Sequence, residues 1–191
     1  MAEVVLFHHA LGLTPGVRSF AGELRAAGHT VHTPDLYDGR TFTTVEEGVD
    51  HARSIGFDTI IARGAAFGEG LPAAVVHAGF SLGVLPAQLL AQTRPGALAA
   101  LLLEACVPVS EFGGRWPDEV PVQVHGMEND PSFAGEGDLD AARDLVAQAA
   151  DGELVLYPGD GHLFTDPASA GYDAEQARVL TARVLKFLAR F

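Results

Sequence analysis

The sequence predicts a single α/β domain in which a mostly parallel, six-stranded sheet is covered by helices on both faces. Two observations support this prediction: six short apolar runs alternate with segments of helical periodicity, and the runs are apolar throughout rather than alternating in polarity. Continuous apolar strands are typical of parallel sheets that are buried on both faces. No repeat, low-complexity segment or linker divides the 191 residues, so we expect one domain over residues 1–191.

The apolar runs define the expected strands, which cover residues 4–8, 29–33, 73–79, 98–103, 120–125 and 153–157. Ligands of such folds bind beyond the carboxyl ends of the strands. The residues that follow each strand are therefore the first place to look for chemistry.

Capping residues define two of the expected helices. Thr14 followed by Pro15 opens the first helix, and Thr44 with Glu47 has the spacing of a capping box for the second. These helices are expected to end near residues 28 and 56. The other helices are expected over residues 58–63, before a glycine-rich stretch at 64–70, and over residues 81–94, 138–150 and 173–191.

The composition limits the classes of function. Twelve Lys and Arg residues against 25 Asp and Glu residues give a net charge of −13, which repels nucleic acid and anionic membranes. A single cysteine, Cys106, excludes an internal disulfide and a cysteine-based zinc site, and no cluster has metal-ligand spacing. The first residues show no signal-peptide pattern and no run is long enough to span a membrane. We expect a cytoplasmic protein without a metal or cofactor.

The strongest functional signal is the pentapeptide Gly79-Phe80-Ser81-Leu82-Gly83. An apolar run precedes it and a helical pattern follows it, which predicts a sharp strand-to-helix turn with a strained, exposed serine. A Cβ at either glycine would collide where the strand and the helix approach each other. The N–H of Leu82 would lie unpaired at the helix start, where it can donate to an oxyanion. In the alternative interpretation, Ser81 only caps the helix.

Residues at two other expected strand ends complement Ser81. A serine hydroxyl needs an imidazole to accept its proton, and the imidazole needs a carboxylate to orient it. Asp130 follows the fifth expected strand and His162 follows the sixth, in the chain order Ser, Asp, His that is typical of α/β-hydrolases. Glu128 is the alternative acid. Asp130 could instead only cap the turn into Pro131, and His162 could be a turn histidine without a catalytic role.

The segment after the first strand and the loop over residues 104–119 are expected to complete the site. The N–H of Ala10 is the expected second oxyanion donor, and His9 and Leu11 are expected to face the substrate. Phe112 and Trp116 are expected to form apolar walls around it.

Other polar residues of the strands are interpreted as structural. His77 and His125 lie within expected strands and are predicted to be core histidines with hydrogen-bonded rings. His8 is interpreted as a core residue or as support for the site. Cys106 ends an apolar run, where a buried hydrophobic role is favoured over a catalytic one.

These motifs together resemble the dienelactone hydrolase family of α/β-hydrolases over essentially the whole chain. The landmarks are residues 9–13, 34–37, 79–83, 125–130 and 157–162. The resemblance implies a compact fold without a lid, a strand order of 2-1-3-4-5-6, and hydrolysis of an ester or lactone through an acyl-enzyme. The family's prototypes have a cysteine where Ser81 stands, a glutamate where His9 stands, and a carboxylate-binding arginine where Asp166 stands. Fold and mechanism therefore carry over better than the substrate.

We predict a serine hydrolase, monomeric or homodimeric, that cleaves a small or medium neutral carboxylic ester or lactone. Ser81 would be the nucleophile, His162 the base and Asp130 the residue that orients the base, while the N–H groups of Leu82 and Ala10 would hold the oxyanion. Two alternatives remain open: a non-catalytic protein of this fold that binds a small ligand, and a thiol hydrolase that uses the single cysteine. No nucleic acid or membrane partner is expected.

Overall fold

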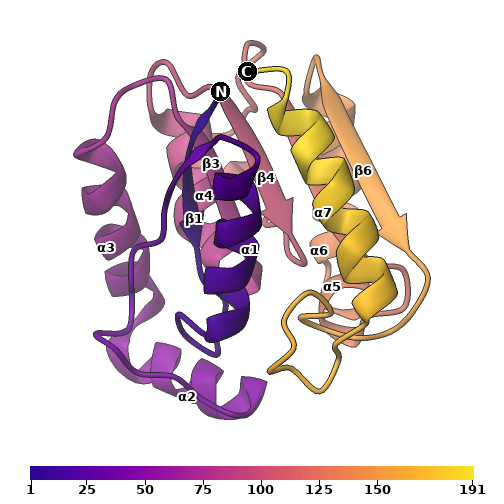
Figure 1. Cartoon of the computed structure of the whole chain (residues 1–191). Helices are drawn as coiled ribbons and strands as arrows, with labels where there is room; N and C mark the ends of the chain where they lie inside the picture. Colours follow the sequence, from indigo (N-terminus) through magenta and orange to yellow (C-terminus); the bar gives the residue numbers. More distant parts are fainter.

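The computed structural model describes residues 1–191 and confirms the layered α/β architecture (Figure 1). All six strands are parallel and form one sheet in the order β2-β1-β3-β4-β5-β6, as the resemblance implied. The strands are β1 (Glu3–Phe7), β2 (Thr30–His32), β3 (Val76–Phe80), β4 (Ala99–Leu103), β5 (Val122–Met127) and β6 (Gly152–Tyr157). The six expected strands are therefore all present, with ends that differ by up to three residues.

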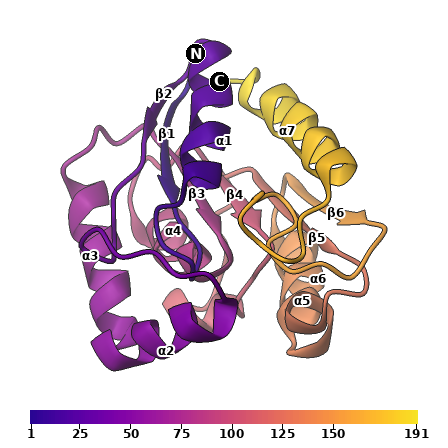
Figure 2. The same cartoon turned by 60° about the horizontal axis from the view of Figure 1, so that its bottom comes forward.

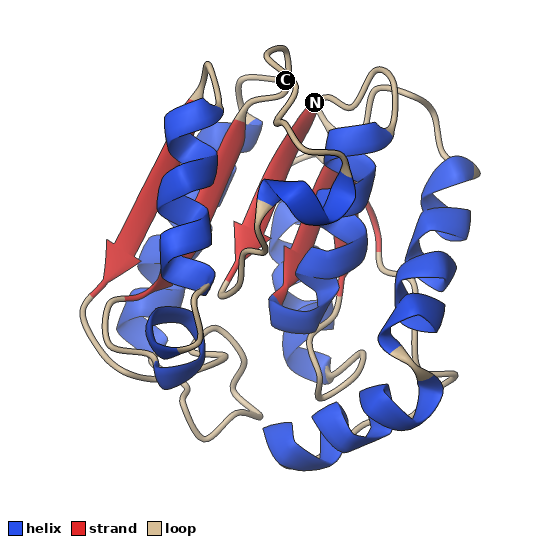
Figure 3. Ribbon diagram, turned by 180° about the vertical axis from the view of Figure 1, so that it is seen from behind, coloured by secondary structure: helices blue, strands red, loops and turns tan.

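Helices cover both faces of the sheet, as Figures 2 and 3 show. They are α1 (Pro15–Ala26), α2 (Val45–Ile55), α3 (Phe57–Glu69), α4 (Val84–Thr93), α5 (Pro131–Gly135), α6 (Asp138–Gln148) and α7 (Ala174–Leu188). Val4 and Leu6 of β1 pack into the core under α1 and α7, whereas Val5 and Phe7 pack into the core on the side of α3, α4 and α6. Alternate residues of a buried strand thus pack into the cores on opposite faces of the sheet, which explains why the strands are apolar throughout. None of the helices combines the length and the apolarity that crossing a membrane requires.

The predicted helix caps are confirmed. The side chain of Thr14 accepts a hydrogen bond from the Val17 N–H at the start of α1. At the start of α2, Thr44 and Glu47 form both hydrogen bonds of a capping box. Each cap satisfies N–H groups that have no partner within the helix, so these two boundaries follow from local sequence.

Helix α3 is longer than the sequence predicts. We expected it to end near residue 63, but it continues through the glycine-rich stretch to Glu69. A Cβ on Gly64 would lie 2.4 Å from Cβ of Pro86, and one on Gly68 would lie 2.6 Å from Cδ1 of Leu90, both on α4. The two glycines therefore allow a close contact between α3 and α4. The stabilisation from packing α3 against α4 outweighs the cost of placing glycine inside a helix.

Alanine at position 64 should lower the free energy of unfolding by about 1–3 kcal/mol, because the added methyl group overpacks against the rigid ring of Pro86. Gly22→Ala in α1 is the matched control. No atom lies within 4 Å of the position of its Cβ, so better helix propensity alone should stabilise the protein by about 0.5–1 kcal/mol. Urea unfolding of both variants tests this difference. Changes in the free energy of unfolding that have the same sign and size in both variants would contradict the packing explanation.

Candidate active site

Strand β3 ends in a sharp turn that carries Ser81. This residue has a φ of 45°, a left-handed conformation that is strained for a residue with a Cβ. It opens a 3-10 turn that leads directly into α4. A Cβ on Gly79 would lie 2.1 Å from the carbonyl oxygen of Gly83, and one on Gly83 would lie 2.5 Å from the carbonyl oxygen of Phe7. The glycines thus let β3, the turn and the end of β1 meet, and the predicted strained turn is confirmed.

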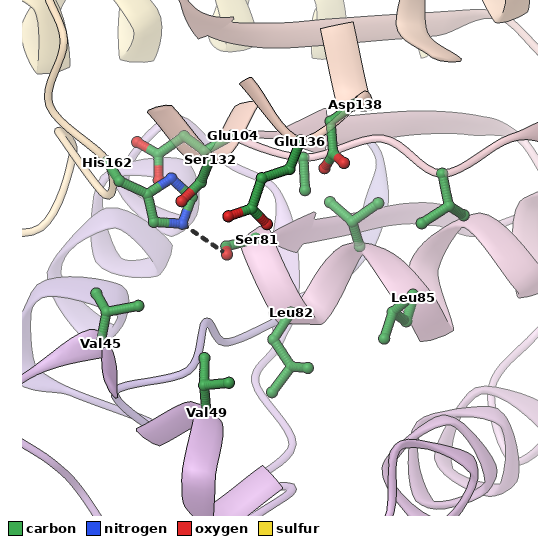
Figure 4. Close-up of a pocket in the computed structure, with 13 residues that line it drawn as sticks. Val45, Val49, Ser81, Leu82, Leu85, Glu104, Ser132, Glu136, Asp138 and His162 are labelled. Atoms are coloured by element: carbon green, nitrogen blue, oxygen red, sulfur yellow. Dashed lines mark hydrogen bonds between the residues drawn. The ribbon is translucent and has the colours of Figure 1, made fainter. Parts of the chain in front are cut away.

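Ser81, His162 and Asp130 form one chain of hydrogen bonds. Oγ of Ser81 lies 2.9 Å from Nε2 of His162 (Figure 4), and Nδ1 of His162 lies 2.7 Å from Oδ2 of Asp130. Because the partner of Nδ1 is a carboxylate, the hydrogen-bond pattern assigns the ring proton to Nδ1 and leaves Nε2 to accept from the Ser81 hydroxyl. The structure therefore brings together residues that follow three different strands.

Asp130 holds His162 and caps a helix at the same time. It is fully buried, and its Oδ1 accepts a hydrogen bond of 2.9 Å from the Ser132 N–H at the start of α5. This short helix was not predicted from the sequence. The two interpretations of Asp130 are thus compatible, since each carboxylate oxygen has its own partner. Glu128, the alternative acid, is exposed and does not contact His162.

The surroundings of His162 favour the protonated ring. Burial alone would lower the pKa of His162. The hydrogen bond to Asp130 and the negative charges of Glu104, Asp130 and Asp138 outweigh burial and raise this pKa. A raised pKa makes the imidazole a stronger base for the serine proton.

The loop that follows β1 lies against the turn of Ser81, because Gly83 packs onto the carbonyl groups of Phe7 and His8. The N–H of Ala10 in this loop makes no hydrogen bond within the protein. Leu82 follows Ser81 in the turn and lines the adjacent pocket. Both predicted oxyanion donors therefore belong to segments that meet at the serine.

His9 does not face the pocket, so this part of the prediction is wrong. Its ring is fully buried, with Nε2 2.7 Å from Oδ2 of Asp166 and Nδ1 accepting a hydrogen bond of 3.3 Å from the Leu11 N–H. Asp166 also accepts hydrogen bonds from the Thr14 hydroxyl and the Ala168 N–H. His9 instead ties the loop after β1 to the loop after β6, because a buried carboxylate distant in sequence captures its ring.

Phe112 and Trp116 do not line the pocket either, and their prediction as its walls is wrong. Trp116 is buried in the core, where its Nε1–H donates a hydrogen bond of 2.7 Å to the carbonyl of Val120. Phe112 lines a separate hollow with Arg94 and Arg115. The loop over residues 104–119 packs Trp116 inward, because an indole ring gains more from burial in the core than from exposure over Ser81.

A pocket of about 220 Å³ opens beside Ser81 and His162. Figure 4 shows apolar side chains on one side of it and carboxylates on the other. The labelled apolar side chains are those of Val45, Val49, Leu82 and Leu85, and the carboxylates are those of Glu104, Glu136 and Asp138. A neighbouring hollow contains Leu11 together with His162, which agrees with the expected position of Leu11 beside the site.

The comparison with protein families decides what kind of protein carries this site. A model of the dienelactone hydrolase family matches residues 1–191. The chain belongs to the dienelactone hydrolase family. No curated protein matches its sequence.

Solved structures of dienelactone hydrolase-like and esterase proteins share the fold. The dienelactone hydrolase-like promiscuous phosphotriesterase P91 from metagenomic libraries is 18% identical, with a TM-score of 0.75 over 100% of this chain and 86% of that chain. Esterase 2 of Thermogutta terrifontis, in a form phosphoramylated by tabun, is 18% identical, with a TM-score of 0.58 over 99% of this chain and 83% of that chain.

Asp166 occupies the position at which the resemblance implied a carboxylate-binding arginine. Burial opposes ionisation of Asp166, but hydrogen bonds from His9, Thr14 and Ala168 outweigh it and lower its pKa. No Lys or Arg lines the pocket or the neighbouring hollow. The site therefore lacks the cation that would hold a substrate carboxylate.

Glu104 is a residue of the site that was not predicted from the sequence. It directly follows β4, has a φ of 64° and is 1% exposed. Its Oε1 accepts hydrogen bonds of 3.3 Å from the N–H and the hydroxyl of Thr165, while Oε2 has no partner. Burial raises the pKa of Glu104 to about 7. The available signal was a charged residue directly after a fully apolar strand, at the same sheet edge as Ser81.

Cys106 shows the environment of a structural thiol. It is fully buried, and burial together with the nearby charge of Asp138 raises the pKa of its thiol. A thiol that resists ionisation is a poor nucleophile, which disfavours the thiol-hydrolase alternative. The structure contains no group of three or more His, Cys, Asp and Glu side chains arranged to hold a metal ion.

The two histidines predicted to lie in the core, His77 and His125, differ in the hydrogen bonds of their rings. His125 is hydrogen-bonded to the Tyr157 hydroxyl at 2.8 Å and to Gln123, as predicted. His77 is also fully buried, but neither of its ring nitrogens has a partner. The prediction of a hydrogen-bonded ring is therefore wrong for His77, because the strand places it among apolar residues of the sheet.

Proposed function

We propose that this protein is a serine hydrolase that cleaves small or medium carboxylic esters or lactones through an acyl-enzyme. Hydrolase activity is supported by membership of the dienelactone hydrolase family. The observation that carries the finer assignment is the hydrogen-bonded chain from Ser81 through His162 to Asp130, which begins at a strained serine beside a pocket.

In the acylation half of the reaction, Oγ of Ser81 bonds to the acyl carbon while Nε2 of His162 takes the hydroxyl proton. The carbonyl oxygen becomes an oxyanion that accepts hydrogen bonds from the N–H groups of Leu82 and Ala10, and each such donor contributes about 3 kcal/mol. His162 then gives its proton to the leaving alcohol as the ester C–O bond breaks. Asp130 keeps the other proton on Nδ1 and balances the charge of the imidazolium.

Deacylation repeats these steps with water as the nucleophile. His162 takes a proton from the water as its oxygen bonds to the acyl carbon, and returns the proton to Oγ of Ser81 as the acyl bond breaks. The products are the free carboxylic acid and the regenerated serine. For a lactone, the alcohol and the acid remain parts of one product molecule.

The dimensions of the pocket support a small substrate. About 220 Å³ accommodates an acyl or alcohol group of a few carbon atoms, and the valine and leucine side chains of α2 and the Ser81 turn supply an apolar wall. The net charge of −13 disfavours nucleic acid and anionic membranes as partners.

A fluorophosphonate probe tests the assignment of the nucleophile. We expect one probe per chain on Ser81 in the folded protein, because His162 activates this hydroxyl, and no labelling after heat unfolding. Ser132→Ala is the matched control, since Ser132 also lines the pocket but its hydroxyl is not bonded to His162. This variant should be labelled like the wild-type protein. Label on another residue, or a folded protein that resists the probe, would overturn the proposal.

A further inference from the structure

Helix α2 stands between two hollows that meet at the candidate active site. The pocket of about 220 Å³ contains both Ser81 and His162, whereas the neighbouring hollow of about 450 Å³ contains His162 without Ser81. The residues that line both hollows are His162 and Val45, the first residue of α2. A substrate bound at Ser81 can therefore extend to either side of Val45.

Close packing against the loop after β1 fixes the position of α2. A Cβ on Gly48 would lie 2.0 Å from the carbonyl oxygen of Ala10, so the backbone of α2 touches the residue whose N–H is an expected oxyanion donor. The Tyr37 hydroxyl donates a hydrogen bond of 3.2 Å to the carbonyl of Gly48, and the Phe42 N–H donates one of 3.0 Å to the carbonyl of Leu11. Helix α2 is thus a fixed wall of the site, and its side chains limit the space on either side.

The two hollows differ in lining as well as in volume. In the pocket that contains Ser81, α2 contributes Val45 and Val49, which lie across from the carboxylates in Figure 4. Val49 lines this pocket and not the other hollow. The larger hollow has a more polar lining, which includes Thr43, Thr44, Asp160 and Ser169. The smaller hollow therefore suits a short apolar group, and the larger one suits a bigger group with polar atoms.

The chemistry of acyl transfer assigns one part of an ester to each hollow. The acyl carbon bonds to Oγ of Ser81, so the acyl chain begins beside this residue. The oxygen of the leaving alcohol has to reach Nε2 of His162, which gives it a proton. The N–H groups of Leu82 and Ala10 would hold the third substituent, the oxyanion. The acyl chain thus belongs in the hollow with Ser81, and the alcohol belongs in the hollow that contains His162 alone.

We infer that α2 sets the specificity of this hydrolase: Val49 limits the acyl part to a short chain, and the hollow on the other side of Val45 accepts a larger alcohol. This inference rests on the proposed serine hydrolase activity. Val49 is half-buried and packs against the core, so its side chain is held at the wall of the pocket.

Two series of esters test the inference. Nitrophenyl esters from acetate to octanoate vary the acyl chain, and acetates of alcohols from methanol to octanol vary the alcohol. We expect kcat/KM to fall by at least about tenfold between the nitrophenyl butyrate and the octanoate, because the longer chain does not fit. Between butyl and octyl acetate, kcat/KM should change by less than about threefold, because the larger hollow holds both alcohols.

Substitutions on the two sides of Val45 should change different series. Val49→Ala enlarges the pocket and should raise kcat/KM for the octanoate, relative to the acetate, by about fourfold to tenfold. Ala170→Leu fills part of the larger hollow from an exposed position and should lower kcat/KM for octyl acetate, relative to methyl acetate, by about threefold to tenfold. Each variant should leave the profile of the other series unchanged.

Ile55→Ala is the matched control for Val49→Ala. Ile55 also belongs to α2 and packs against the same core, but it lines neither hollow. Both profiles of this variant should match those of the wild-type protein. Circular dichroism verifies that each variant is folded, and the exposed position of Ala170 keeps the test available even if Val49→Ala does not fold.

The outcomes separate this inference from the proposed function. An acyl profile that Val49→Ala and Ile55→Ala alter alike, or that neither alters, would refute the role of Val49. A change of the acyl profile in Ala170→Leu would refute the assignment of the two hollows. Both results leave the serine hydrolase standing, provided that the fluorophosphonate probe labels Ser81. Failure to hydrolyse any ester of either series, together with failure of the probe, would overturn the proposed function as well.

Discussion

Ser81→Ala should lower kcat by about a millionfold toward the tested esters, because it removes the atom that forms the acyl-enzyme. The residual rate would come from the oxyanion donors and from binding, which the substitution leaves in place. The Ser81 side chain makes its hydrogen bond to His162 and none to the core, so the loss should arise in the chemical step. Steady-state kinetics measure the loss of kcat, and a burst experiment with a nitrophenyl ester shows whether the acylation step is lost.

The substitution should leave both the thermal stability and the KM nearly unchanged. The thermal midpoint of Ser81→Ala should stay near that of the wild-type protein, since alanine keeps the Cβ and therefore the strained conformation at φ 45°. The KM for an ester should change much less than kcat. Activity of Ser81→Ala within a few-fold of the wild-type value would end the assignment of this residue as the nucleophile.

Acidification from about pH 6 to pH 4 should lower the free energy of unfolding by about 3–5 kcal/mol. Burial lowers the pKa of three fully buried histidines, that of His8 to about 4, of His77 to about 4 and of His125 to about 3. Below their ordinary pKa of about 6.5, the unfolded chain binds protons at these positions while the folded chain does not. Stability contributed by the neutral rings is therefore present above about pH 6.5 and is lost as the pH falls.

Two carboxyl groups oppose this loss. Burial raises the pKa of Glu104 to about 7 and also raises that of Asp138, so the folded state binds protons there that the unfolded state releases. A net uptake of about one to two protons on unfolding remains, which corresponds to a loss of about 1.4–2.7 kcal/mol per pH unit between about pH 6 and pH 4. Over these two pH units the loss is about 3–5 kcal/mol, which is a substantial part of a typical total stability of about 5–15 kcal/mol.

His77→Leu tests the origin of the acid sensitivity. The substitution removes one of the three buried rings whose pKa is lowered, so the dependence of unfolding free energy on pH should become shallower by about 1.4 kcal/mol per pH unit. It also removes two ring nitrogens that have no partner, so stability near pH 7 should rise. Val76→Ala on the same strand is the control: it should lower stability at every pH and leave the slope unchanged. Urea unfolding between about pH 5 and pH 7 gives the slopes, and identical slopes for wild type and His77→Leu would refute a neutral buried ring.

Much of the candidate site could be predicted because it depends on local signals and on one rule of topology. The turn at Ser81 follows from two glycines of one pentapeptide, which remove clashes within the turn and with the end of β1. Asp130 and His162 could be placed near it because the carboxyl ends of parallel strands lie at the same edge of the sheet. Neither step requires knowledge of which side chains meet in the core.

The sequence by itself thus determined the layered α/β architecture, the N-caps of α1 and α2, and the candidate nucleophile, base and acid. Only the tertiary structure decided that Asp166 captures His9, that Trp116 turns into the core, that α3 continues through Gly64 and Gly68, and that Glu104 joins the pocket. The physical reason is the same in each case. A buried polar group goes where a partner exists and an apolar group goes where space exists, and both the partner and the space come from segments distant in the chain.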